Sequence, residues 1–574
     1  MAVTPIGQLR HTWRTRRIQR IQGLSFSGWT IAVLAITCLM ALPLIGVLSG
    51  AFSHLGVDSA DSVWGHLTTT VLPGYVLNSL GLMVGVGAGV LLLGITTAWL
   101  VTVCDFPGRR IFEWALLLPL AAPAYLLAYA YTDFLEYFGP VQTTLRGWFG
   151  WQSATEYWFP DVRSLGGAIV LFSLVLYPYV YILVRVAFLE QSLCAVEASR
   201  TLGCGPWRSF FKVALPLARP AIAAGTALAL METLNDFGTV QYFGVPTFTT
   251  GIYRTWLGMG ERLAATQLAG VSLLFIAVLI VLEQLSRRQA RYYRSNRRQQ
   301  SQCVYLLRNW RAVVATLICG LPVVLGLILP AGLLLYMTVA NLDKTLDAEF
   351  FELASHSLIL AGVSAGLGIV LALVLAYGAR LQPNQGVRLG VQISSLGYAI
   401  PGAVIAVGIL SPIGRLDNAI ATMAEQLFGI APGLLLSGTI AALIFAYLVR
   451  FLAVALNTVE SGLTKIRPSL DDASRSLGNS PFTTLLKVHA PLLSGSLLTA
   501  AMLVFVDVMK ELPATIVIRP FNFDTLAVRV YQYASDERLV EASAPALAIL
   551  IVGLLPVILL SYRITQTRQR SESA

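Results

Sequence analysis

The chain contains 574 residues, of which 56% are hydrophobic and only 12% are charged, and its mean hydropathy is +0.70. Soluble domains carry about 25% charged residues, so this composition excludes a string of ordinary soluble domains and indicates a membrane protein. The formal net charge is +10, and the positions of the basic residues decide what that charge means.

Twelve segments are long and apolar enough to cross a hydrocarbon core of about 30 Å, which takes roughly 20 residues of helix. In the first half we predict spans at 27–52, 76–103, 112–132, 165–188, 218–240 and 264–284. In the second half we predict spans at 312–338, 355–379, 389–412, 433–455, 493–516 and 541–561. Pro123 and Pro401 interrupt the third and the ninth span, which leaves their boundaries the least defined.

The basic residues orient these spans. They precede the first span, fill the connector between the halves and follow the last span: Arg10, Arg14, Arg16, Arg17, Arg20; Arg287, Arg288, Arg291, Arg294, Arg297, Arg298; Arg563, Arg568, Arg570. By the positive-inside rule, both termini and the connector are cytoplasmic. The net charge therefore mostly reflects the orientation of the chain in the membrane. We expect a lipid bilayer and no nucleic acid as the partner of the basic residues, which would also be attracted to anionic lipid headgroups. The apolar run from Ser27 is too long for a cleaved signal peptide, so it stays as the first span.

A polar segment near residue 200 is repeated near residue 475. Glu197-Ala198-Ser199-Arg200-Thr201-Leu202-Gly203 is echoed without a gap by Asp472-Ala473-Ser474-Arg475-Ser476-Leu477-Gly478, about half the chain further on. Nearer the N-terminus, Asn78-Ser79 and Pro123 match His356-Ser357 and Pro401 at a slightly larger separation. Composition alone makes apolar segments similar, but it does not repeat a polar loop, so the chain consists of two related halves.

Six spans in each half give both halves the same orientation, related by an axis along the membrane normal. We therefore predict five regions: a basic cytoplasmic N-terminus (1–26), a first six-helix half (27–285), a basic cytoplasmic linker (286–311), a second six-helix half (312–562) and a cytoplasmic tail (563–574).

The repeated segment predicts a short cytoplasmic helix, a sharp turn and a return helix that leads into a span. Gly203 and Gly478 break the first helix because glycine readily adopts a positive φ, and Pro216 and Pro491 stand where the next span begins. Such a loop can transmit a movement of a soluble partner to the membrane-spanning helix that follows it. The alternative is an ordinary amphipathic loop on the membrane surface, which two copies in register on one face disfavour.

This segment resembles the signature loop of permease subunits in binding-protein-dependent ATP-binding-cassette importers, E-A-A-x-x-x-G followed after nine residues by I-x-L-P. The departures are mild: Ser for the second Ala in both copies, and Asp472 for Glu and Ala490 for Leu in the second. A permease with both halves in one chain is similar to the ferric-iron importers, and the stretch from Asp507-Val508-Met509-Lys510-Glu511-Leu512-Pro513 to Asp524-Thr525-Leu526 is similar to one typical of that subgroup.

The resemblance implies an all-α polytopic membrane protein of the type I importer kind, with two parallel six-helix repeats. It also implies a periplasmic substrate-binding protein and two copies of a cytoplasmic ATPase. No G-x-x-x-x-G-K-[ST] motif occurs in the chain, so we expect no cofactor bound by it and ATP with Mg²⁺ on the partner subunits. The expected role is transport and not enzymatic. By the resemblance, segments 195–205 and 470–480 dock on the ATPases through Glu197, Ala198, Ser199, Arg200, Gly203, Pro216, Asp472, Ala473, Ser474, Arg475, Gly478 and Pro491.

Four acids lie in the fifth and eleventh predicted spans at duplicated positions. Glu232 and Asp236 share the spacing i, i+4 with Asp507 and Glu511, which would place each pair on one helix face. Intramembrane charge usually faces a bundle interior, so these acids, with Tyr177, are candidates for a translocation path. Hard oxygen ligands would suit ferric iron, although the sequence leaves any metal ligands unknown. The alternatives are pairing with groups such as Lys510, or a place at the interface, where aromatic residues often serve as anchors.

Two other classes of protein remain as alternatives. An ion-coupled secondary transporter also has duplicated halves but has no need of the repeated cytoplasmic loop. A membrane enzyme is disfavoured because H-E-x-x-H does not occur and the five histidines form no cluster. Within the importer class, thiamine, another small cation or an organic anion could replace ferric iron, because the binding protein usually sets specificity.

Overall fold

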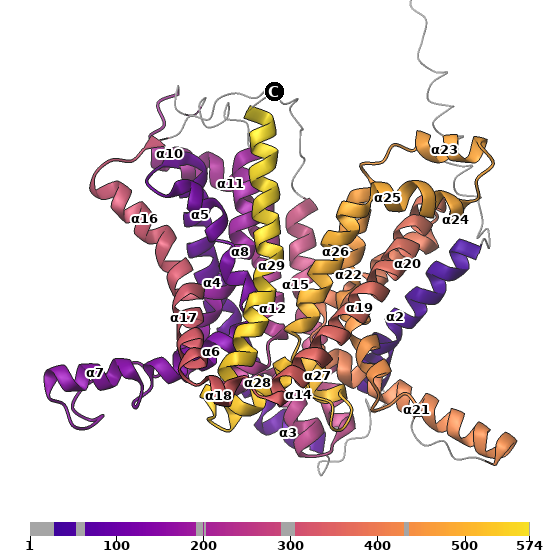
Figure 1. Ribbon diagram of the computed structural model, residues 1–574, viewed down its shortest axis with the longest axis horizontal. Coiled ribbons are helices and arrows are strands. Elements are labelled where there is room, and N and C mark those ends of the chain that lie inside the picture. Colours follow the sequence, from indigo (N-terminus) through magenta and orange to yellow (C-terminus); the bar gives the residue numbers. More distant parts are fainter. Residues whose placement is uncertain are drawn as a thin grey trace, which may run out of the picture. The chain divides into compact units, whose positions relative to one another are not determined.

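The computed structural model describes residues 28–52, 63–190, 199, 202–288, 305–429 and 435–572. Within these ranges the chain is almost entirely helical (Figure 1), which confirms the predicted all-α class. The strands that it does contain there, β1 (Cys104–Asp105) and β2 (Tyr305–Leu306), form one short parallel pair.

Nine helices of the described part are long and apolar enough to cross a membrane, or up to twelve spans if each of three bent helix pairs is one span. The long helices are α2 (Gly28–Phe52), α4 (Leu72–Val103), α8 (Leu165–Glu190), α15 (Arg262–Arg288), α16 (Trp310–Val323) continued through η4 (Val324–Ile328) into α17 (Leu329–Ala340), α19 (Ala348–Leu381), α21 (Gly402–Phe428), α22 (Ile440–Leu463) and α29 (Leu539–Glu572).

The three bent pairs stand at the third, fifth and eleventh predicted spans. The first runs through α5 (Arg109–Ala115) and η1 (Leu118–Ala121) into α6 (Ala124–Leu135) and α7 (Pro140–Phe149) with a bend of 90°. The second runs through α10 (Pro206–Ser209), the π-helical η2 (Phe210–Ala214) and α11 (Leu215–Leu217) into α12 (Arg219–Asn235) with a bend of 69°. The third runs through α24 (Pro481–Thr484), the π-helical η6 (Leu485–His489) and α25 (Ala490–Leu492) into α26 (Ser494–Met509) with a bend of 80°.

Several predicted span boundaries are wrong. In the fifth and eleventh spans, α12 and α26 end earlier than expected, at Asn235 and Met509. The ninth span, expected at 389–412, is split into α20 (Gln385–Ser394), η5 (Leu396–Ala399) and α21, because Pro401 in an extended conformation (ψ 140°) separates them. The tenth, expected at 433–455, begins only at Ile440, after a turn in which Gly438 has φ +71°.

Short helices connect the spans. They are α3 (Val63–Thr70), α13 (Gly238–Tyr242), α14 (Phe248–Tyr253), η3 (Arg254–Gly258), α18 (Leu342–Thr345), α23 (Ser469–Ser476), α27 (Pro513–Ile518) and α28 (Leu526–Ser535).

By contact, the chain divides into two compact units. The first contains residues 1–43, 362–398 and 447–505, and the second contains residues 44–361, 399–446 and 506–574. These units group residues by packing and do not follow the two halves of the sequence, whose boundaries remain a prediction.

In the second unit, α4, α8 and α12 pack against one another. A Cβ atom on Gly225 of α12 would lie only 2.7 Å from the Cα atom of Val180 in α8, so the backbones approach closely only because this residue is glycine. Small residues allow such packing where lipid supplies no hydrophobic drive for helix association. The outer side of α4 exposes Leu77, Val84 and Leu92, as expected of a helix that faces lipid.

In the first unit, the part of α22 from Tyr447 onward contacts the turn at Gly397. A Cβ atom on Gly397, just before the break at Pro401, would lie 1.8 Å from the carbonyl oxygen of Val449, so this turn rests directly on the α22 backbone. Tyr377 of α19 packs edge-on against Trp29 of α2, with ring centroids 5.3 Å apart. The later part of α19 and α22 thereby support the segment that carries the second repeated loop.

Candidate functional site

The second copy of the repeated loop is a helix, a turn and a second helix. Helix α23 carries Asp471 and Asp472 in its first turn, where a negative charge favours the helix dipole. Gly478 follows with φ +81°, and Ser480 then caps α24 by accepting a hydrogen bond from the Thr483 amide at 3.2 Å. This is the geometry that the sequence predicts, including the positive φ at the glycine.

Both copies close in the same way. The hydroxyl groups of Ser474 and Thr484 lie 2.8 Å apart, and those of Ser199 and Ser209, their equivalents in the first half, lie 2.7 Å apart. All four residues are buried, and Gly203 has φ +83°. The loop is therefore held shut by a buried hydroxyl pair that joins its outgoing helix to its return helix.

The predicted docking residues of the second copy divide by exposure. Asp472, Ala473 and Arg475 lie on α23; Asp472 and Arg475 are exposed there, whereas Ser474 faces inward to its hydroxyl partner. Leu477, next to the turn, is 80% exposed, and its counterpart Leu202 is 84% exposed. An apolar tip flanked by charged residues is suited to a protein partner.

In the first copy, three of the predicted residues, Glu197, Ala198 and Arg200, lie outside the described residues. Pro216 lies in α11 and Pro491 in α25, each just before the bend that leads into the following span. Both bends begin with a π-helical turn, η2 in the first half and η6 at the equivalent place in the second. The repeated unit thus extends from the exposed loop through a π-turn to a bent span.

An ionic cluster braces the second loop, and sequence analysis did not identify it. Asp471 accepts hydrogen bonds from Arg380 at 2.7 and 2.9 Å and lies 2.6 Å from the Nε2 atom of the fully buried His489. Arg380 also donates to the carbonyl oxygens of Leu463 and Ile466. One cluster therefore ties α19, α22, α23 and η6 together. The one feature of the sequence that could have indicated this cluster is a single arginine at the end of the eighth predicted span.

The first half cannot form the same cluster. The residues equivalent to Asp471 and His489 in the register of the repeated loop are Val196 and Ala214, and the residue equivalent to Arg380 in the register of the earlier blocks is Thr102. In this half, Trp99 of α4 contacts Phe188 and Phe210, with ring centroids 5.4 and 4.7 Å apart. The duplicated loops therefore share their closing hydroxyl pair and differ in what supports them.

The candidate path acids do not lie on two continuous helix faces, which corrects the prediction. Helix α12 ends at Asn235 and α26 at Met509, so Asp236 and Glu511 lie in the turns beyond. Asp236 accepts from the amides of Thr239 and Val240, and Glu511, its equivalent in the second half, accepts from the amides of Ala514 and Thr515. Each carboxylate caps the short helix that follows, because it satisfies amides that lack an intrahelical partner.

These two turns contact each other inside the second unit. A Cβ atom on Gly238 would lie 2.9 Å from Leu512 and 2.8 Å from Tyr125. The Tyr125 hydroxyl group is 3.5 Å from the carbonyl oxygen of Lys510. The duplicated turns after α12 and α26 thus pack together, with one tyrosine between them.

The remaining path candidates, Glu232, Asp507 and Tyr177, do not cap a helix. Glu232 is half-buried on α12, while Asp507 on α26 forms an ion pair with Lys510 at 2.9 Å. Tyr177 is fully buried on α8. Among the described residues, no group of three or more His, Cys, Asp or Glu side chains could hold a metal ion.

Comparison with known proteins gives relatives of several transport systems. The chain is 26% identical to the Fe(3+)-transport system permease protein FbpB 2 of Haemophilus influenzae over 84% of this chain and 88% of the relative. It is 30% identical to the molybdenum transport system permease protein ModB of Escherichia coli over 34% of this chain and 84% of that relative. It is 28% identical to the sulfate transport system permease protein CysT of Synechococcus elongatus over 50% of this chain and 97% of that relative.

A family model matches the chain twice, once in each half, at residues 90–294 and 368–570. Each match contains one copy of the repeated loop together with the bent span that follows it. The chain is a multi-pass membrane protein and belongs to the binding-protein-dependent transport system inner membrane component family.

Proposed function

We propose that this chain forms the membrane path of an ATP-driven importer in the bacterial inner membrane, with both termini in the cytoplasm. A periplasmic binding protein delivers the substrate, two copies of a cytoplasmic ATPase supply the energy, and the chain alternates between outward-open and inward-open states. The observation that carries this proposal is the duplicated loop, with its buried hydroxyl pair, its positive-φ glycine and its exposed leucine.

The loop supports a mechanical role because it is joined to a span without a flexible stretch. From Gly478 the described backbone continues through α24, η6 and α25 to the 80° bend at the start of α26. Closure of the ATPases on ATP would move the docked loop, and the helix behind it would pass the movement into the span. In energetic terms, nucleotide binding favours one of two permease conformations, and transport depends on that coupling free energy.

Ferric iron is the proposed substrate. Three relatives are aligned over most of this chain; one has Fe(3+) transport in its name and the other two have ferric transport in theirs. Molybdate or sulfate is the second candidate, since relatives named for molybdenum and sulfate transport align with parts of the chain. Uptake of each solute with the cognate binding protein would decide between a metal cation and an oxyanion.

The coupling role is tested by Gly203→Pro combined with Gly478→Pro. Both glycines have a positive φ, +83° and +81°, whereas proline is fixed near about −65°, so the turn cannot form in either loop. We expect this variant to reach the membrane but to lose transport and substrate-stimulated ATP hydrolysis. The measurement is uptake into vesicles that contain the assembled transporter, with ATPase activity recorded on the same sample.

The matched control is Gly205→Ala, two residues after Gly203. Gly205 does not have a positive φ, and a Cβ atom there meets nothing within 4 Å, so alanine fits without strain. This control should transport normally. Normal transport by the double proline variant would remove the loops from the coupling mechanism.

A further inference from the structure

The second unit carries a compact aromatic excursion at the end opposite to α10. It spans residues 137–158 and includes α7, which follows the 90° bend after Pro123. Figure 1 shows α7 lying across the direction of α4 and α8, which are the long spans of the same unit. A helix that crosses the span direction at the end of a bundle lies parallel to the membrane plane.

The excursion is held together from within. Gln142 is buried, donates to the carbonyl oxygen of Leu135 at 2.7 Å and accepts a hydrogen bond from the Tyr157 hydroxyl group. The Arg146 guanidinium lies 3.9 Å from the ring centroid of Tyr137 and donates to the carbonyl oxygen of that residue at 2.6 Å. These contacts fix the return segment 150–158 against α7, so the side chains that point outward are held in place.

The outward side chains are large and aromatic. Phe138 is 90% exposed, Trp158 85%, Trp148 79% and Phe149 64%. The charged residues of segment 137–158 are Arg146 and Glu156, and both have partners inside it, the latter through the Gln152 amide at 3.0 Å. The most exposed side chains of the excursion are therefore apolar and aromatic, and they lie beside the exposed polar residues Thr143, Gln152 and Glu156.

The second half has a counterpart in the distal part of α21. Leu416, Met423 and Leu427 are exposed at the spacing i, i+7, i+11, which places them on one side of the helix. Asp417 is buried and accepts hydrogen bonds from the amides of Leu435, Leu436 and Ser437, which holds residues 435–437 against α21. In the register of the repeated loop, Asp417 is the equivalent of Gln142, which has the same role in the first excursion.

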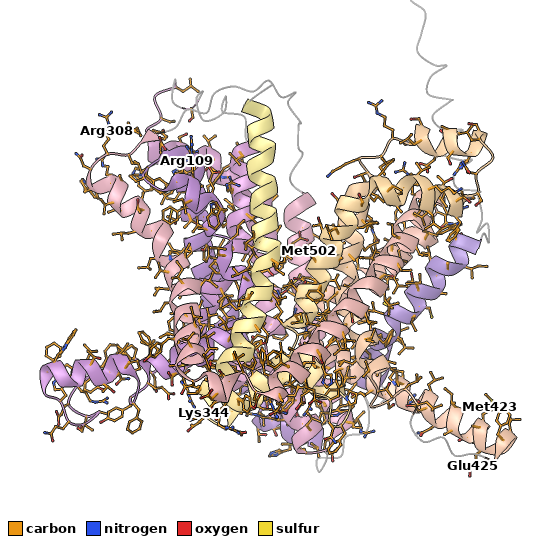
Figure 2. The ribbon with its side chains drawn as sticks, in the orientation of Figure 1. Arg109, Arg308, Lys344, Met423, Glu425 and Met502 are labelled. Atoms are coloured by element: carbon orange, nitrogen blue, oxygen red, sulfur yellow. The ribbon has the colours of Figure 1, made fainter. Side chains whose placement is uncertain are left out.

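Polar residues occupy the other side of α21. In Figure 2, Met423 and Glu425 lie on opposite sides of the helix near its free end. Helix α21 ends at Gly429 with φ +66°, and α7 ends at Gly150 with φ +72°. Both halves therefore carry an amphipathic helix at the end of the unit opposite to α10, held by a buried polar side chain to described residues that follow it.

We propose that the two excursions, 137–158 and 412–429, are interfacial anchors that insert their apolar sides into the headgroup boundary of the outer leaflet. The lipid-facing side chains of α4 already place this unit in a bilayer. Trp, Phe and Tyr are enriched at that boundary, and an amphipathic helix lies in its plane. The first excursion exposes four large aromatic side chains and a single exposed charged residue, Glu156, which favours lipid over a binding protein. The anchors would hold the permease at a fixed depth while its spans change their tilt.

The test places an environment-sensitive fluorescent amino acid at single positions of the full chain in lipid nanodiscs. Met423 is compared with Glu425 on α21, and Trp148 with Thr143 on α7; all four side chains are exposed, and in each pair they lie on different sides of the helix. Quenching is measured with phospholipids brominated near the headgroup and deep in the acyl chain, and with iodide in the water.

We expect labels at Met423 and Trp148 to be quenched several-fold more by the shallow bromines than labels at Glu425 and Thr143, which should respond to iodide. Equal iodide quenching at all four positions would overturn the proposal. Shielding of Met423 and Trp148 that appears only when a binding protein is added would also overturn it, in favour of a protein-docking surface. None of these outcomes depends on the identity of the substrate or on ATP coupling.

Discussion

Arg380 is the residue that connects the second loop to the helices behind it. Its guanidinium group donates to one Asp471 carboxylate oxygen and to the carbonyl oxygens of Leu463 and Ile466, where α22 ends. Carbonyl groups at a helix end lack intrahelical partners, and a planar five-donor fork can satisfy them and a carboxylate together. A lysine at this position could not reproduce that geometry.

Burial alone would raise the pKa of Asp471, but hydrogen bonds from His489 and Arg380 outweigh it and hold the pKa below the ordinary value of 3.8. A carboxylate with a lowered pKa contributes stability that is complete above the ordinary value. That stability is lost only as pH falls through the lowered one. The cluster should therefore hold the second loop unchanged at neutral and mildly acidic pH, and release it only below about pH 4.

We predict that Asp471→Asn loosens α23 at neutral pH. It removes a charged acceptor from two partners, at a cost of about 2 kcal/mol. Relative to the intrinsic rate at each pH, hydrogen exchange of the 469–478 amides in nanodiscs should rise by an order of magnitude or more, and the loss of protection below about pH 4 should disappear. Asp472→Asn is the matched control: this exposed neighbour should leave exchange unchanged even if it weakens ATPase docking. Equal exchange in the two variants would contradict the bracing role.

At the scale of elements, the turns after α12 and α26 explain why duplicated acids stand there. Asp236 begins α13 and Glu511 begins α27 by accepting amide hydrogen bonds. The Thr239 and Thr515 hydroxyl groups add a further bond to each carboxylate. Since the two turns also pack together, each cap fixes one side of a contact between the halves of the sequence.

Asp236→Ala and Glu511→Ala should each destabilise the protein by about 1–2 kcal/mol, because each leaves helix-terminal amides without an acceptor. The check is the thermal unfolding midpoint of the purified protein in nanodiscs. Asp507→Ala serves as the control, since its partly exposed pair with Lys510 is worth less than about 1 kcal/mol. If the control lowered the midpoint as much as the cap variants, the capping interpretation would fail.

At the scale of the whole molecule, the two halves share one backbone contact of the same span, although some charged residues near the duplicated segments have no charged equivalent. Asn78 donates to the Pro246 carbonyl oxygen at 3.1 Å, and a ring nitrogen of His356 lies 3.2 Å from the Asp524 carbonyl oxygen. The two contacts span the same 168 residues. By contrast, Asn235 corresponds to Lys510, and Val196 to Asp471. This backbone contact is thus shared by both halves, while the charged groups at these positions differ.

Glu232 and Asp507 are the two candidate path acids that do not cap a helix. We predict that Glu232→Gln combined with Asp507→Asn lowers the initial rate of substrate uptake several-fold, because a cation would lose two carboxylates along its route. Uptake should be measured together with the thermal unfolding midpoint, which this variant should barely change, so that a loss of stability is not mistaken for a loss of transport. Full uptake would exclude both residues from the path.

Much of this fold could be predicted from sequence, because twelve apolar stretches and a repeated polar loop are strong local signals. Glycine at positions 203 and 478 predicts a positive φ, and both residues have one. The break at Pro401 was placed correctly, but the span around it was not, because α21 continues beyond the apolar residues as an amphipathic helix. The cluster of Arg380, Asp471 and His489 could not be predicted, since Arg380 lies 91 residues from Asp471 in the chain and the two meet only through packing.

The support behind the two loops has a mechanical consequence. The hydroxyl pair is common to both, but the second loop is backed by charged groups that tie four helical segments, while the corresponding positions of the first are uncharged. In the proposed assembly, two identical ATPase copies would then act on two loops that are supported by different contacts. Equal displacements at the two loops would reach the two bent spans through different contacts, charged behind the second loop and aromatic behind the first.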